Sequence, residues 1–211
     1  MSIKTKSENL FESFLQANGV RFEQIEQATT PRPDYLIYDG RNGKIIFEIK
    51  ELAEDDNFGV VHPTHPHITS FSAIVGEHVR RRIELSKRQI QYGAKQGIPS
   101  VLLIYNSLDP LQMVGTEDVD FTTAMYGQLT TLINKKTGAG SELFHGRNQL
   151  LQKNKNTSFS AVGHLCDRSG KTTVKLFENA YAAVKLPFDA MPPCLGVVRV
   201  QLDDDVPLVV P

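Results

Sequence analysis

Three residues whose types suit metal-assisted chemistry lie within a short stretch of the chain: Asp34, Glu48 and Lys50. Oxygen ligands favour Mg²⁺ or Mn²⁺, and Mg²⁺ is usually held by one or two carboxylates together with water and substrate phosphate. Glu48 and Lys50 are two positions apart, so on a strand their side chains leave the same face. Two carboxylates with a neighbouring ammonium therefore indicate phosphoryl-transfer chemistry.

The intervening residues predict a hairpin that would bring the two carboxylates together. Two runs rich in β-branched and aromatic residues flank a turn cluster, and these three segments are 35–38, 44–49 and 39–43. With a five-residue loop, Tyr38 pairs with Lys44, and the same register sets Asp34 opposite Glu48. Like charges in opposed positions destabilise a sheet. A cation or a metal ion must therefore offset the repulsion.

An ion-paired strand end is the alternative interpretation of this charged group. Phe47 and Ile49 flank Glu48, and two further isoleucines precede it, so we expect a central strand with at least one buried face. Charges in such a place are rarely left without a partner or a metal. The burial expected for this strand favours a functional site.

The spacing resembles the motif of the PD-(D/E)XK nuclease superfamily, with Pro33-Asp34 followed fourteen positions later by Glu48-Ile49-Lys50. The resemblance implies an α/β fold, namely a restriction-endonuclease-like mixed β-sheet core flanked by helices. It implies that Asp34, Glu48 and Lys50 are catalytic, and that Asp34, Glu48 and the Ile49 carbonyl hold Mg²⁺ or Mn²⁺. DNA is favoured over RNA as the partner, and relatives that cut both strands often form homodimers.

The expected order of elements fits that core. Helical periodicity covers 4–18 and 71–96, and strand patterns cover 20–25 and 100–105. Residues 1–106 would form the nuclease-like core, and 107–211 a β-rich extension packed in the same domain. In the extension we expect a helix at 121–129, strands at 129–134, 159–166, 173–178 and 195–202, and a hairpin turn at 167–170. The sequence Ser169-Gly170-Lys171-Thr172 resembles the end of a phosphate-binding loop, but it lacks the first glycine and belongs to this turn.

Both predicted helices offer further candidates. The superfamily often places a glutamate near the metal, and Glu8 is preferred over Glu12 because it lies closer to the apolar stripe of the first helix. An ordinary solvated glutamate is the alternative for both. On the second helix, Lys87 and Gln89 are expected to bind substrate, although a run of charged residues on a helix is usually a solvated face.

Three histidines follow the motif strand in a proline-rich loop: His62, His65 and His67. They lack both the helical His-x-x-x-His spacing and cysteine partners of common zinc sites. A rigid loop or a substrate lid is therefore preferred over a transition-metal site.

The composition of the chain limits the functional classes to which it can belong. The net charge of −1 supplies no overall attraction to nucleic acid, which counts against a simple binding module. The first residues carry no apolar signal segment, so a cytoplasmic location is expected. The rival to a metal-dependent nuclease is a catalytically inactive module with the nuclease fold that binds a protein partner or nucleic acid.

Overall fold

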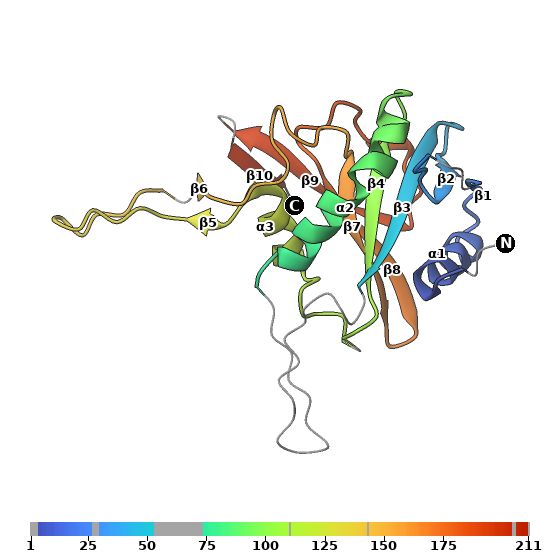
Figure 1. Cartoon of the computed structure of the whole chain (residues 1–211), viewed down its shortest axis with the longest axis horizontal. Coiled ribbons are helices and arrows are strands. Elements are labelled where there is room, and N and C mark those ends of the chain that lie inside the picture. The colour runs from blue at the N-terminus through green and yellow to red at the C-terminus, as the bar shows by residue number, and fades with distance from the viewer. Residues whose placement is uncertain are drawn as a thin grey trace, which may run out of the picture.

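The computed structural model describes residues 4–26, 30–52, 74–109, 111–142, 144–203 and 206–210. Within these ranges the fold is α/β: one mixed sheet has the strand order β1-β2-β3-β4-β7-β8-β9-β10, and helices pack against it (Figure 1). Its strands are β1 (Phe22–Gln24), β2 (Tyr35–Tyr38), β3 (Lys44–Leu52), β4 (Ser100–Asn106), β7 (Ala161–Arg168), β8 (Lys171–Glu178), β9 (Leu195–Asp203) and β10 (Val206–Val210). The expected α/β class and mixed sheet are confirmed.

The other elements in the described ranges are three α-helices, a short 3₁₀ helix and a two-stranded arm that projects from the body (Figure 1). They are α1 (Lys6–Ala17), α2 (Glu77–Ala94), α3 (Asp118–Tyr126), η1 (Phe188–Ala190), β5 (Leu129–Thr130) and β6 (Phe144–His145). No helix in the described ranges is long and apolar enough to span a membrane.

Strand direction sets where the ends of the central strands meet. β3 is antiparallel to β2 and parallel to β4, and β4 is parallel to β7. The carboxyl ends of β3, β4 and β7 therefore lie at the same edge of the sheet. Because β7 lies next to β4, strands from both the predicted core and the predicted extension build one sheet.

Two apolar layers cover the sheet, one on each face. On one face, Phe11 of α1 packs with Phe47 and Ile49 of β3. On the other face, Leu52 of β3 packs with residues of α2 and α3. Side chains alternate along a strand, so Glu48 and Lys50 share the α2 face with Leu52. β3 is thus buried on both faces.

Gly93 lets α2 approach the sheet closely. A Cβ atom at this position would lie 2.6 Å from Ile46 Cδ1 and even closer to the Ser100 hydroxyl, which is a steric clash with both strands. The C-terminal end of α2 is therefore seated directly on β3 and β4, and its contact fixes the height of the helix above the face that carries Glu48.

Several element boundaries differ from the sequence prediction for local reasons. α2 begins at Glu77, after Gly76 in a left-handed conformation, while 71–73 lie outside the described ranges. α3 begins earlier than expected because Glu117 and Asp120 form a capping box, and it ends before Gly127, whose φ is 100°. The strand expected at 129–134 is only two residues long, and farther along the arm the pairing is reduced to an isolated bridge between Ile133 and Gly140.

The second hairpin is tighter than expected. Arg168 pairs with Lys171, which leaves a loop of only Ser169 and Gly170. Both loop residues have positive φ, 54° and 74°, as a two-residue hairpin turn of this kind requires. This confirms that the lysine and threonine after Gly170 belong to a hairpin strand.

Candidate functional site

Asp34 immediately precedes β2 and is tied to β3 by two hydrogen bonds. Its backbone N–H donates to the Phe47 carbonyl at 3.1 Å, and its Oδ2 atom accepts from the Ile49 N–H at 2.7 Å. The predicted register is correct through the Tyr38–Lys44 pair, but the ladder ends at Tyr35–Phe47. Asp34 therefore contacts β3 through both its backbone N–H and its side chain, one residue beyond the last pair of the ladder.

Glu48 is the buried centre of the site. Its side chain is 1% exposed, and its Oε1 atom lies 2.5 Å from the Lys50 ammonium, whose side chain is 28% exposed. The second carboxylate oxygen, Oε2, is buried and has no hydrogen-bond partner among the residues that the structure describes. Leaving a buried carboxylate oxygen without a donor is costly, and a proton shared between Glu48 and Asp34 would satisfy it in the metal-free protein. A bound cation can take the place of that proton.

The two carboxylates influence each other's protonation. Burial, with a further contribution from the charge of Asp34, raises the pKa of Glu48 to about 8, against the opposing charge of Lys50. Burial also raises the pKa of Asp34, opposed by the hydrogen bond from Ile49 and by the charge of Lys50. Carboxylates coupled in this way titrate as a pair. In the metal-free protein the pair therefore retains about one proton at neutral pH.

The Ile49 carbonyl faces the same side as Asp34. In a strand, the N–H and C=O of one residue point toward the same neighbouring strand. The Ile49 N–H is bonded to the Asp34 carboxylate, at the level just before β2 begins. The Ile49 carbonyl therefore also points to the β2 side of β3, beyond the first residue of β2. The side chains of Asp34 and Glu48 and the main-chain carbonyl of Ile49 thus provide three oxygen donors from the start of the hairpin and from β3.

Glu8 is held at the start of α1. Its Oε2 atom accepts hydrogen bonds from the Thr5 N–H at 2.6 Å and the Thr5 hydroxyl at 2.8 Å, which completes a capping box. Its charge contributes to the raised pKa of Asp34, so the two carboxylates are electrostatic neighbours. Among the described residues, no group of three or more His, Cys, Asp or Glu side chains could hold a metal ion. A ligand role for Glu8 stays a prediction.

Glu12, the competing glutamate, has structural partners. It lies 2.5 Å from the Lys4 ammonium and accepts a hydrogen bond from the Tyr35 hydroxyl at 2.9 Å. Burial and this carboxylate together raise the pKa of Tyr35. Glu12 therefore connects α1 to the start of β2.

The two candidates on α2 lie beside its buried stripe. Lys87 forms an ion pair with Glu84 one turn earlier, and Gln89 is half-buried. Their predicted contact with substrate stays a prediction. The predicted histidine loop, with His62, His65 and His67, falls outside the described residues.

Ser86 was not predicted from the sequence: it is fully buried on α2, and its hydroxyl has no hydrogen-bond partner within the described ranges. It precedes Gly93 by seven residues, which is about two turns of helix, so Ser86 lies on the same face of α2 as Gly93, the face that contacts β3 and β4. The signal was a polar residue within the apolar stripe of a helix.

No family model, no curated protein and no solved structure matches this chain. Its own residues therefore carry the functional argument.

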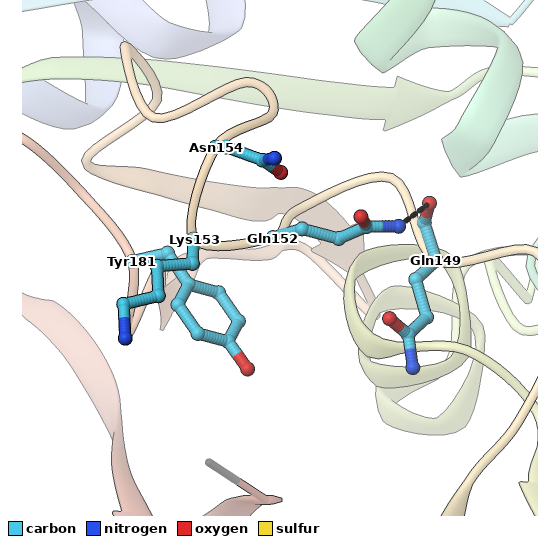
Figure 2. A pocket seen from close by; sticks show the side chains of 5 residues that line it. All are labelled: Gln149, Gln152, Lys153, Asn154 and Tyr181. Atoms are coloured by element: carbon cyan, nitrogen blue, oxygen red, sulfur yellow. Dashed lines mark hydrogen bonds between the residues drawn. The ribbon is translucent and has the colours of Figure 1, made fainter.

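A hollow of about 300 Å³ lies elsewhere, lined by Gln149, Gln152, Lys153, Asn154 and Tyr181. Figure 2 shows the Tyr181 ring and the Gln149 side chain on opposite sides of it, with Gln152 between them. The Gln152 amide donates to the Gln149 carbonyl at 3.3 Å. None of the predicted site residues lines this hollow.

Proposed function

We propose that this protein is a Mg²⁺-dependent nuclease of the PD-(D/E)XK type that hydrolyses phosphodiester bonds in nucleic acid. One observation carries the proposal: the buried Glu48 carboxylate, which is coupled to Asp34 and in contact with Lys50, has an oxygen that no described residue bonds. In a purely structural ion pair, an unpaired buried oxygen serves no purpose. A metal ligand, in contrast, needs an oxygen that is free to coordinate the ion.

The donor set fits a hard divalent cation. Asp34, Glu48 and the Ile49 carbonyl would hold Mg²⁺ or Mn²⁺, which prefer oxygen ligands. When bound, such an ion polarises the scissile phosphate and lowers the pKa of a bound water. Glu8 would be an additional carboxylate, reached only by giving up its bonds to Thr5.

Lys50 would stabilise the negative charge that develops on the phosphate in the transition state. Its ammonium is partly exposed and has three donors, so it can bond both the Glu48 carboxylate and a phosphate oxygen. Donors that are already positioned where charge develops stabilise a transition state most effectively. Phe47 and Ile49 limit the freedom of the strand that carries these groups, because both are buried under α1.

The element order supports a restriction-endonuclease-like core. α1, β1, β2, β3, α2 and β4 follow one another as helix, three strands, helix and strand, with Asp34 of the motif directly before β2 and its other residues on β3. This order is the one the superfamily resemblance implies. DNA is the proposed substrate in preference to RNA, and a homodimer is the proposed form for cutting both strands.

The test compares cleavage of labelled DNA and RNA, single- and double-stranded, with Mg²⁺ or Mn²⁺. We expect Asp34→Asn and Lys50→Ala to lower the cleavage rate at least 100-fold, consistent with loss of electrostatic stabilisation. Lys44→Ala is the matched control, because Lys44 is an exposed lysine on the same strand. Cleavage that survives both site variants overturns the assignment.

Calorimetric titration with Mn²⁺ separates the nuclease from an inactive module. At neutral pH, Mn²⁺ binding should release about one proton, because the ligands must be deprotonated. Titrations in buffers of different ionisation enthalpy measure this release. Glu48→Gln should abolish both binding and proton release; no Mn²⁺ binding, or binding unaffected by this change, would favour the module.

A further inference from the structure

The second hairpin carries a group of cations on the same sheet face as Glu48. A hollow of about 380 Å³ is lined by His164, Cys166, Arg168, Ser169, Lys171, Thr173 and Lys175. These residues include three cations and no carboxylate. An adjoining hollow of about 440 Å³ shares His164 and Arg168, and its lining includes the carboxylates of Glu117 and Asp118. We call the first hollow the hairpin patch.

Backbone pairing fixes the hairpin patch relative to Lys50. Lys50 pairs with Ile104, Ile104 with His164, and His164 with Lys175, so these four residues form one row across β3, β4, β7 and β8. Adjacent strands lie about 4.8 Å apart, which puts the backbone of His164 about 10 Å and that of Lys175 about 14 Å from Lys50.

The row faces the helices α2 and α3. Ile104 belongs to the apolar layer under these helices, and the His164 ring lies 5.8 Å from the ring of Phe121 in α3. Arg168 ends β7 and Lys171 begins β8, at the same edge where β3 ends. The hairpin patch and the carboxylate site therefore share both a sheet face and a sheet edge.

The side chains of the hairpin patch are suited to phosphate. Arg168 and Lys171 are exposed, while Lys175 is half-exposed and pairs with Asp118 at the rim. Arg168 also donates to the Gln112 carbonyl at 3.3 Å, which leaves most of its five donors for a ligand. Thr173 adds an exposed hydroxyl.

His164 contributes an uncharged group at the base of the hairpin patch. Its Nε2 atom is buried, and no residue in the described part of the chain forms a hydrogen bond with it. Burial, together with the charges of Arg168 and Lys175, lowers the pKa of His164 to about 4, so the ring is neutral at physiological pH. A neutral ring with an unpaired nitrogen can hydrogen-bond to a ligand.

We propose that the hairpin patch binds a backbone phosphate of the nucleic-acid strand, a few nucleotides from the phosphodiester held at Glu48 and Lys50. This inference rests on the proposed function, since it assigns a second contact to the same substrate. It supplies the local positive charge that the overall charge of −1 lacks.

The test is the affinity for a fluorescently labelled DNA oligonucleotide, measured by anisotropy in EDTA so that no hydrolysis occurs. Arg168→Gln combined with Lys171→Gln should weaken binding at least tenfold and reduce the salt dependence by about two counterions. Lys44→Gln combined with Lys95→Gln is the matched control: both lysines are exposed, the charge change is equal, and they lie near the opposite edge of the sheet. The control should bind within twofold of the wild type.

A kinetic measurement keeps this inference separate from the proposed function. With Mn²⁺, the Arg168 and Lys171 double variant should hydrolyse bis(p-nitrophenyl) phosphate at the wild-type rate, because that small ester cannot span the two sites, while KM for DNA rises tenfold. Equal weakening by both double variants, or by neither, overturns the inference alone. A wild-type protein that binds no nucleic acid overturns the proposed function as well.

Discussion

The Asp34 carboxylate accepts the backbone N–H of Ile49 at 2.7 Å, so a side chain continues the sheet where the β2 ladder stops. The same carboxylate is electrostatically coupled to Glu48. One residue thus completes the edge of the hairpin and provides a charge for the site. Its two roles can be separated by substitution.

Asp34→Asn should retain the fold and lose cleavage. An amide oxygen can still accept the Ile49 N–H, whereas Asp34→Ala leaves that N–H without its partner and should lower the free energy of unfolding by about 1–2 kcal/mol. Urea denaturation followed by circular dichroism measures the difference. Equal stability of the two variants would show that the hydrogen bond does not support the sheet.

Glu48→Gln should stabilise the metal-free protein at alkaline pH. The folded-state pKa of Glu48 is raised to about 8, above its unfolded value, so the folded protein binds the extra proton. Wild-type stability therefore falls as pH rises between the unfolded pKa and about 8. The glutamine variant lacks this loss and should be more stable by about 1–3 kcal/mol at pH 8.5.

Thermal unfolding in EDTA at pH 5 and at pH 8.5 provides the comparison. The difference between wild type and Glu48→Gln should be small at pH 5 and large at pH 8.5. A gap that is the same at both values, or larger at pH 5, would contradict the assigned protonation of Glu48.

Ser86→Ala should leave stability unchanged or raise it by about 1 kcal/mol, because a buried hydroxyl without a partner is a net cost. If this hydroxyl bonds water or phosphate in the loaded site, kcat/KM for DNA should fall about threefold to tenfold. Ser13→Ala, at an exposed serine of α1, is the control. A large loss of stability would point to a structural bond instead.

Gly93→Ala should destabilise the protein by about 1–3 kcal/mol, because the added methyl group meets Ile46 and Ser100. Gln91→Ala on the exposed side of the same helix should change stability by less than about 0.5 kcal/mol. Denaturation midpoints of both variants test this. A neutral Gly93→Ala would mean that α2 is not seated on β3 as closely as described.

The sequence predicted the motif hairpin well because its signals are local. Asp39 closes the turn by accepting the N–H groups of Arg41 and Gly43, and Asn42 adopts a φ of 60°, as expected for a turn cluster of this composition. The alternation on β3 also correctly placed Glu48 and Lys50 on one face.

The features that were not predicted from the sequence depend mostly on tertiary contacts. Thr5 and Glu8 carry a capping-box spacing that could have been recognised. The link between Glu12 and Tyr35 joins residues 23 positions apart and leaves no local pattern. The order of strands beyond β4 is likewise a matter of long-range pairing, so the alignment of Lys50 with His164 appears only in three dimensions.

Ile104 separates Lys50 from His164 in that row and is fully buried. An aliphatic side chain offers no hydrogen bond to a ligand, and the low effective dielectric of a buried place strengthens rather than screens the interaction of nearby charges. A charge added to the hairpin is therefore expected to act on the carboxylate pair as well. Redesign of the hairpin would have to allow for a change in the protonation of Glu48.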